Sequence, residues 1–146
     1  MNKACEMTKQ YAPLIGRILL ALIFILSGFG KIIAFNSTAG YIAGHGLPMP
    51  QVLVVAAILI ELGGGIMLVL GWQARWAALA IFLFVIPTTL IFHPFWIADA
   101  EQMQNQINFL KNLAIMGGML YIMAFGSGPC SLGKIDKCGE KLGEKA

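Results

Sequence analysis

Charged residues are scarce in this chain. Lys, Arg, Asp and Glu make up 12% of its 146 residues, about half of the share that soluble domains carry. Three of them lie within residues 1–10 and seven within residues 131–146, which leaves seven for the 120 residues between. So few charges cannot cover the surface of a soluble fold, and the composition excludes a soluble enzyme and a disordered tail. The positive residues gather at the chain ends and form no stripe, which excludes a nucleic-acid partner.

Histidine and cysteine are also few. Neither His45 nor His93 lies in the middle of a long apolar stretch, so we expect no haem or copper centre held by this chain alone. Seven residues separate Cys130 from Cys138, so these two form no C-x-x-C redox or zinc pair. We therefore predict no metal site. Cys5, Cys130 and Cys138 are interpreted as plain thiols, with a thiol-redox role as the alternative.

Long apolar stretches are present instead. Hydrophobic residues make up 58% of the chain, and its mean hydropathy is +0.78. A helix needs about 20 apolar residues to cross a bilayer, and four such stretches fit, at residues 12–35, 52–70, 76–92 and 107–125. The connections between them are too short for a second domain. We predict an all-α polytopic membrane protein, with a four-transmembrane-helix bundle over residues 12–125, an N-terminal segment 1–11 and a charged tail 126–146.

The distribution of lysine and arginine predicts the orientation. Cations fall in the N-terminal segment and at the start of the first span, between the second and third spans, and in the tail, whereas the connections 36–51 and 93–106 hold none. Cytoplasmic segments carry the excess of Lys and Arg. Both termini are therefore predicted to lie in the cytoplasm.

Three charged residues fall inside the predicted spans. Lys31 and Lys111 lie about 6 Å below the outer ends of the first and fourth helices, and Glu61 about 13 Å below that of the second. Ionisable groups inside a membrane are costly and usually mark a site or a pathway. We predict that Glu61, Lys31 and Lys111 form the candidate catalytic group, which exchanges protons or binds a substrate head group.

Further polar residues lie on the same outer side. His93 closes the third predicted helix, and Asn108 and Asn112 share a helical face with Lys111. Each of the four helices thus supplies a polar group to the outer half of the bundle. We predict that Asn112, Asn108 and His93 help to bind a substrate or quinone head group.

A purely structural interpretation exists for each of these residues. Both lysines can extend to the outer headgroups, and His93 can serve as an interfacial cap. Glu61 is too short to do so and must be paired, protonated or hydrated, so an ion pair with either lysine would fix the helix packing and nothing more.

Structural or lipid contacts are predicted at four other positions. Arg17 lies near the cytoplasmic end, where it binds a lipid phosphate or another helix, and Arg75 follows the second span. Gly64 and Gly65 beside Glu61 let helices approach closely, with room for a flat ligand as the alternative.

The order and spacing of these residues resemble the DoxX family of small four-helix bacterial inner-membrane proteins. The matching positions are Gly16-Arg17, Phe24, Ser27-Gly28 and Lys31, then Glu61, Gly64-Gly65, Leu68, Gly71, Arg75 and Ala77-Ala78, and finally Lys111-Asn112, Gly117-Gly118, Gly126-x-Gly128 and Ser131-Leu132. The resemblance covers residues 12–133. One departure is Gly133, where the family often continues with an aspartate.

The resemblance implies a bacterial inner-membrane location and a link to quinone chemistry. Members are described as subunits of thiosulfate:quinone oxidoreductase or of a terminal quinol oxidase. Arg17, Lys31, Glu61, Lys111 and Asn112 match family motif residues. The chain shows no flavin fingerprint, iron–sulfur cysteine set or haem ligands, so we expect no covalently bound cofactor. A quinone ring fits the polar group, because its carbonyl oxygens can accept from Lys31 or Lys111, and a small oxyanion such as thiosulfate fits the two lysines equally well. Any redox step is then direct or shared with a partner subunit.

The resulting prediction is an accessory or quinone-interacting subunit of a membrane oxidoreductase. Its expected partners are the lipid bilayer, quinone and other oxidoreductase subunits, and a homo-oligomer is compatible with the sequence. Two alternatives stay open: a non-enzymatic assembly or stress-response factor held together by the polar cluster, and a small-solute exporter or channel.

Overall fold

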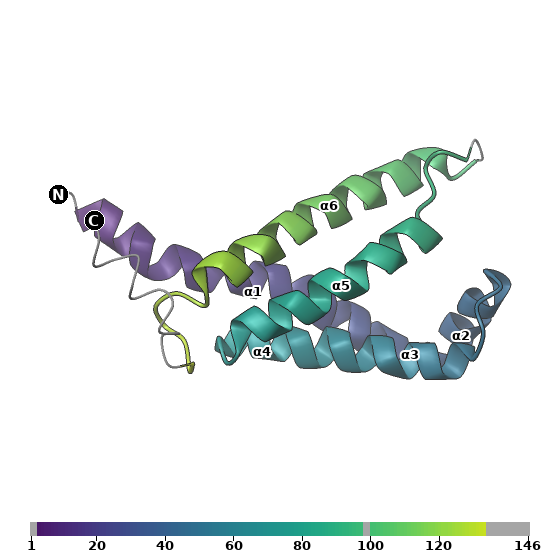
Figure 1. The fold of residues 1–146 in the computed structure, drawn as a ribbon, viewed down its shortest axis with the longest axis horizontal. Helices are drawn as coiled ribbons and strands as arrows, with labels where there is room; N and C mark the ends of the chain where they lie inside the picture. Colours follow the sequence, from purple (N-terminus) through teal and green to yellow (C-terminus); the bar gives the residue numbers. More distant parts are fainter. Residues whose placement is uncertain (1–2, 98–99, 134–146) are drawn as a thin grey trace.

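The chain forms long helices that lie against one another (Figure 1). The computed structural model describes residues 3–97 and 100–133. In these two ranges the elements are α1 (Lys3–Ile33), α2 (Phe35–Gly44), α3 (Pro50–Ile58), the π-helical turn η1 (Leu59–Gly63), α4 (Gly64–Leu70), α5 (Ala74–Phe92) and α6 (Gln102–Phe125). Since α3, η1 and α4 form one continuous helix, four helices are long and apolar enough to cross a membrane. The predicted all-α, four-helix fold is confirmed.

Proline and glycine mark several helix ends. Pro50 opens α3, where its missing N–H would have had no helical partner anyway. Gly71 ends α4 and Gly126 ends α6, with φ of 67° and 79°. Glycine enters this region without steric cost. These breaks place the short α4–α5 turn and the end of α6 at the same end of the bundle.

The helices extend beyond the apolar stretches seen in the sequence. α1 begins at Lys3 and α6 at Gln102, because the polar residues that precede each span contain no helix breaker. The connection expected over residues 36–51 contains α2, a helix of 10 residues. Ten residues are too few to cross a bilayer, so the sequence does not mark this segment as a span.

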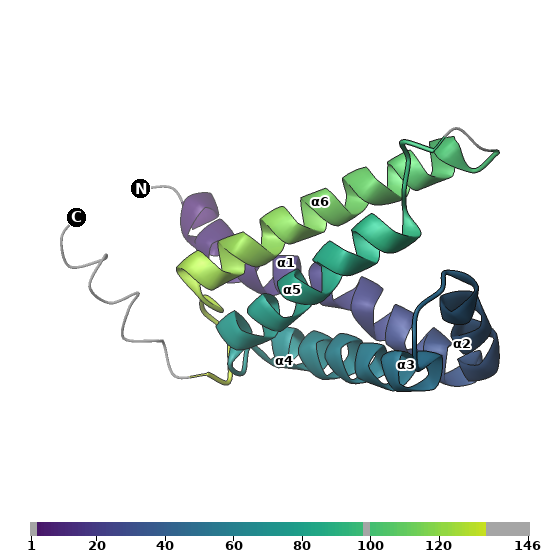
Figure 2. The ribbon, with the colours of Figure 1, turned by 45° about the vertical axis from the view of Figure 1, so that its right-hand side comes forward.

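Two arms of the fold diverge from a common end (Figures 1 and 2). At the end where α1 begins and α6 finishes, α1, α4, α5 and α6 lie together. Towards the opposite end, the first arm consists of α2, α3 and the end of α1, and the second arm of α5 and α6. The structure thus places the start of α1 and residues 126–133 at one end, while their cytoplasmic location stays a prediction.

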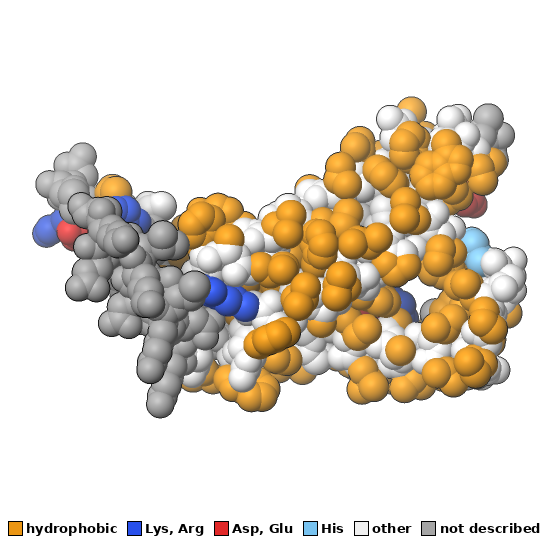
Figure 3. All heavy atoms as spheres, in the orientation of Figure 1, with side chains coloured by type: hydrophobic (Ala, Val, Ile, Leu, Met, Phe, Trp, Pro, Cys, Tyr) orange, Lys and Arg blue, Asp and Glu red, His pale blue; other side chains and the backbone are white. Residues whose placement is uncertain are grey.

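Close helix packing at the centre depends on two adjacent glycines. A Cβ atom at Gly64 would lie 2.9 Å from Ile81 Cδ1 on α5, and one at Gly65 would lie 2.8 Å from Ile25 Cγ1 on α1. The two glycines therefore let the α4 backbone approach helices on both sides. Outside this core the surface is largely apolar, as Figure 3 shows for one face, and large side chains such as Leu19, Leu59 and Leu83 are exposed as lipid contact requires.

Candidate functional site

The central feature of the site is an ion pair between two helices. Lys31 Nζ lies 2.9 Å from Glu61 Oε2 and 3.0 Å from Oε1, so the ammonium group donates to both carboxylate oxygens. Ser27, one turn before Lys31, accepts from Nζ at 2.7 Å and donates to Glu61 Oε1 at 3.2 Å. Glu61 is 5% exposed. The pair is therefore hydrogen-bonded as well as charge-compensated, as a buried pair requires.

A local break in the helix positions Glu61. The residue lies in the π-helical turn η1, whose wider backbone spacing changes the direction of the side chains. α1 passes very close to this turn, because a Cβ atom at Gly28 would lie 2.8 Å from Leu62 Cγ and 3.3 Å from Glu61 Cβ. The π turn and Gly28 together bring the carboxylate within reach of Lys31.

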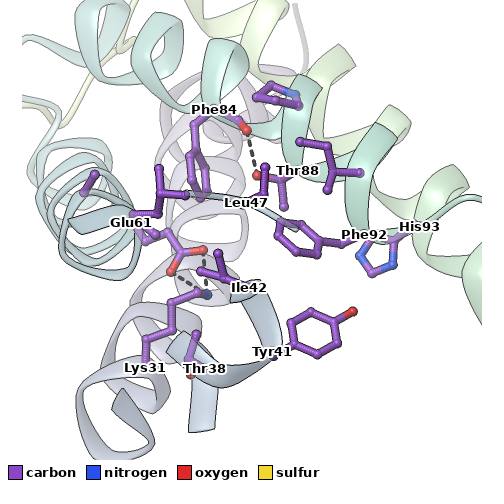
Figure 4. A pocket seen from close by; sticks show the side chains of 15 residues that line it. Lys31, Thr38, Tyr41, Ile42, Leu47, Glu61, Phe84, Thr88, Phe92 and His93 are labelled. Atoms are coloured by element: carbon purple, nitrogen blue, oxygen red, sulfur yellow. Dashed lines mark hydrogen bonds and ion pairs between the residues drawn. The ribbon is translucent and has the colours of Figure 1, made fainter. Parts of the chain in front are cut away.

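A pocket of about 400 Å³ lies between the two arms, with the ion pair at one side. Ligand pockets are usually about 300–1,000 Å³ and mostly apolar, with a few polar groups. Apart from the ion pair and His93, the lining residues are Thr38, Tyr41, Ile42, Leu47, Leu53, Ala56, Ala57, Phe84, Pro87, Thr88, Ile91 and Phe92. Figure 4 shows His93 across the pocket from Lys31 and Glu61. The pocket therefore has a charged side and an imidazole side, separated by apolar walls.

Aromatic contacts join α2 to the end of α5 beside the pocket. The rings of Tyr41 and Phe92 are stacked with centroids 5.5 Å apart, and His45 contacts the edge of Phe92 at 4.9 Å. Such aromatic pairs contribute about 0.5–1.5 kcal/mol beyond the area they bury. They are the described ring contacts that connect the two arms.

His93 lies just beyond the membrane-spanning part of α5. Burial lowers the pKa of His93 and the charge of Lys111 lowers it further, while a hydrogen bond with the Asn105 side chain opposes both effects. Its Nδ1 atom is buried and has no hydrogen-bond partner among the described residues. A neutral imidazole with one nitrogen available can donate to, or accept from, an occupant of the pocket.

The structure separates the α6 residues from the ion pair. Lys111 is exposed and donates to Asn108 Oδ1 at 3.0 Å, and Asn112 donates to Thr89 Oγ1 at 2.9 Å. No described residue of α6 lines the pocket. The predicted convergence of six polar residues is thus divided: Lys31, Glu61 and His93 share the pocket, whereas Lys111, Asn108 and Asn112 form a polar strip on the α5–α6 arm.

Arg17 connects α1 to the chain segment that follows α6. Its side chain is 2% exposed, and the guanidinium group donates to the carbonyl oxygens of Ser127 and Cys130. Arg75, in the first turn of α5, lies 3.4 Å from the position of a Cβ atom at Gly126. Both arginines therefore adjoin residues 126–133. Cys5 and Cys130 are exposed free thiols, and Cys138 lies outside the described residues.

Sequence reasoning missed two groups of residues at the site, one in the ion-pair network and one in the pocket lining. Ser27 is part of the ion-pair network, and its signal was the four-residue spacing to Lys31, which places both on one helical face. Tyr41 and Thr38 line the pocket from α2, which the sequence presented only as a connection. The four-residue spacing of Tyr41 and His45 was the signal available there.

Four helices apolar enough to cross a membrane, with an ion pair beside a largely apolar pocket between them, define a polytopic α-helical membrane protein. The sequence profile of DoxX matches residues 12–94. The chain is 37% identical over 120 residues to the inner membrane protein YphA of Escherichia coli K12, covering 82% of this chain and 86% of that protein. It is 33% identical over 122 residues to the inner membrane protein YqjF of the same organism, covering 84% and 89%. The chain therefore belongs to the DoxX family. No solved structure matches it.

Proposed function

We propose that the pocket binds the head group of a membrane quinone and that the chain serves as a quinone-interacting subunit of an inner-membrane oxidoreductase with both termini in the cytoplasm. The observation that carries this proposal is the ion pair of Lys31 and Glu61 at the side of an apolar pocket within the membrane-spanning helices. A quinone is apolar except for its carbonyl oxygens, so this combination of walls and donors suits it.

The two polar sides of the pocket match the two carbonyl groups of a quinone ring. Lys31 can donate to one carbonyl oxygen when it gives up its hydrogen bond to Ser27 or to one oxygen of Glu61. His93 Nδ1 is available to the other carbonyl oxygen. The apolar walls, which include Phe84 and Phe92, accommodate the ring. When a partner subunit takes two electrons from a bound quinol, the Glu61 carboxylate and the neutral His93 imidazole are the bases positioned to accept its two protons.

The test is quinone retention by the full-length protein. We would purify it in a mild detergent and quantify co-purified quinone by mass spectrometry. The double substitution Lys31→Gln/Glu61→Gln keeps hydrogen bonding between the two side chains while it removes both charges, and we expect it to lower the bound quinone at least ten-fold. Lys111→Gln is the matched control, because it removes a membrane cation outside the pocket. Wild-type protein without quinone, or equal loss in both variants, would contradict the proposal.

The ion pair also favours a second candidate, a non-enzymatic role in which it holds the bundle together. Removing one partner of a buried pair costs about 3–5 kcal/mol, so Glu61→Leu would destabilise the protein and the exchanged pair Lys31→Glu/Glu61→Lys would restore it. If the exchanged pair restores both stability and quinone retention, the result supports quinone binding in the pocket with the two charges in either order. Restored stability in a protein that never retains quinone supports the structural role.

A further inference from the structure

A second groove lies at the opposite end of the molecule from the pocket. It is formed where α1 and α6 meet, has a volume of about 590 Å³, and does not include any residue of the pocket between the arms. Figures 1 and 2 both show the end of α6 beside the first half of α1. Gly118 lies closest to α1 there, since a Cβ atom on it would be 3.0 Å from Leu20 Cδ1.

The groove has a polar outer end and a mostly apolar remainder along α1. Thr8 and the exposed Lys9 line its outer part, Ala12, Pro13 and Gly16 line its middle, and Arg17 and Leu20 line its inner part together with Gly118. From Lys9 to Leu20 the helix rises about 16 Å, which is about half of the hydrocarbon thickness of a bilayer. The length therefore suits a molecule that spans one leaflet.

Arg17 adds a second positive charge beside this groove. The residue is 2% exposed, its terminal nitrogens donate to Ser127 and Cys130, and it lines the groove. Together with Lys9, this charge favours an anionic occupant over a neutral one.

We propose that the α1–α6 groove binds one anionic phospholipid. The phosphate lies at Lys9, the glycerol beside Ala12 and Pro13, and an acyl chain along Gly16 and Leu20. This order of charge, linker and hydrocarbon is the order in a glycerophospholipid. Gly16 has no neighbouring atom within 4 Å of its Cβ position, so an acyl chain can lie against the α1 backbone there.

Gly16 gives a test with a matched control. Neither Gly16 nor Gly30 has a neighbouring atom within 4 Å of its Cβ position, but only Gly16 lines the groove. We would delipidate the full-length protein, titrate it with phosphatidylglycerol or with phosphatidylcholine of the same acyl chains, and count bound lipids by native mass spectrometry. We expect one phosphatidylglycerol to bind at least ten-fold more tightly than phosphatidylcholine, Gly16→Leu to abolish this preference, and Gly30→Leu to preserve it.

A second pair of variants tests the charge without altering the packing. Lys9→Gln should weaken phosphatidylglycerol binding about five-fold and leave phosphatidylcholine unchanged, as expected for one lysine near an anionic headgroup. Lys3→Gln, on the same helix but outside the groove, should have no effect. Equal binding of the two lipids, equal effects of the paired variants, or a lipid-free dimer that Gly16→Leu dissociates would overturn the proposal.

Discussion

At the scale of single residues, the buried side chain of Arg17 holds two distant segments of the chain together. Its forked guanidinium group donates to two carbonyl oxygens, of Ser127 and Cys130, which lie more than a hundred residues further along the chain. Ser131 and Arg17 also lie so close to Gly71 that a side chain at position 71 would overlap both residues. Arg17 therefore fixes residues 127–130 against the end of the bundle.

We predict that Arg17→Lys releases this segment. A lysine ammonium group is a single point donor and cannot replace the fork, and each lost bond to a charged donor costs about 1.5–3 kcal/mol. Hydrogen–deuterium exchange at residues 127–132 should accelerate at least ten-fold, with residues 74–92 unchanged. The variant Lys9→Gln is the control for loss of a nearby cation. Unchanged exchange in Arg17→Lys would show that other contacts hold the segment.

His93 leads to a prediction about pH. Because burial holds the pKa of His93 below its ordinary value in the folded protein, the unfolded chain binds this proton more readily. The resulting stability is fully present above the unfolded pKa of about 6.5 and is lost as the pH falls below it. The melting temperature in detergent should therefore fall between pH 7.5 and 5, and the fall should be smaller in His93→Gln. The control His45→Gln loses the ring contact with Phe92 at every pH but keeps His93, so it should melt lower and retain the fall between pH 7.5 and 5; an identical slope in all three proteins would exclude His93 as the cause.

Residue-level prediction from the sequence was most useful for charges inside the predicted spans. Lys31 and Glu61 could be singled out because a charged side chain inside a membrane is costly and usually has a role. In the structure, Lys31 Nζ lies 2.9 Å from Glu61 Oε2. Lys111 carried the same signal, yet it bonds to Asn108 on its own helix. Depth in the membrane is readable from the sequence, whereas the direction of a side chain around the helix depends on packing that only the fold determines.

At the scale of helices, three adjacent glycines have different surroundings. Gly65 packs against Ile25 and the carbonyl oxygen of Ala21, whereas Gly63 has no atom within 4 Å of its Cβ position. Gly64 faces Ile81 on the other side. The sequence shows the run of glycines, but it does not show which of them lies at a helix contact.

We predict opposite results for two alanine substitutions in this run. Gly65→Ala should destabilise the protein by about 1–3 kcal/mol, because a Cβ atom 2.8 Å from Ile25 Cγ1 overpacks the contact with α1 and Ile25 must move. Gly63→Ala should be neutral or stabilise by up to about 1 kcal/mol through helix propensity. Thermal unfolding in detergent measures both. If the two variants melt together, the contact of Gly65 with α1 is looser than the structure indicates.

Two helical features could not be predicted from the sequence. The π turn at Leu59–Gly63 leaves no signal in hydropathy, because the residues before and after it are equally apolar. α2 is amphipathic over only 10 residues and was hidden in a connection. Both features shape the pocket, so the sequence indicated the charged groups of the site but not its aromatic and apolar walls.

At the scale of the whole molecule, four spans would leave the start of α1 and residues 126–133 on one side of the membrane. The structure brings the start of α1 and residues 126–133 to the same end of the bundle (Figure 2), and the distribution of Lys and Arg predicts that this end is cytoplasmic.

Two exposed thiols provide the measurement of orientation. Cys5 and Cys130 both lie at this end, so each single-cysteine variant should react with a membrane-impermeant maleimide in inverted vesicles and not in intact cells. A cysteine introduced at Ser37, an exposed residue of α2 at the other end, should show the reverse pattern. Labelling of Cys5 in intact cells would invert the predicted topology.

The divergence of the two arms has a mechanical consequence. The pocket is lined by residues of both arms, and the arms are joined at the far end by the short turn between α4 and α5. Beside the pocket, the ring contacts of Tyr41 and His45 with Phe92 also connect the arms. An occupant that separated the arms would break these contacts and widen the protein in that leaflet, against the lateral pressure of the surrounding lipid. Bilayer tension and acyl-chain composition would then be variables in the binding equilibrium, just as concentration is.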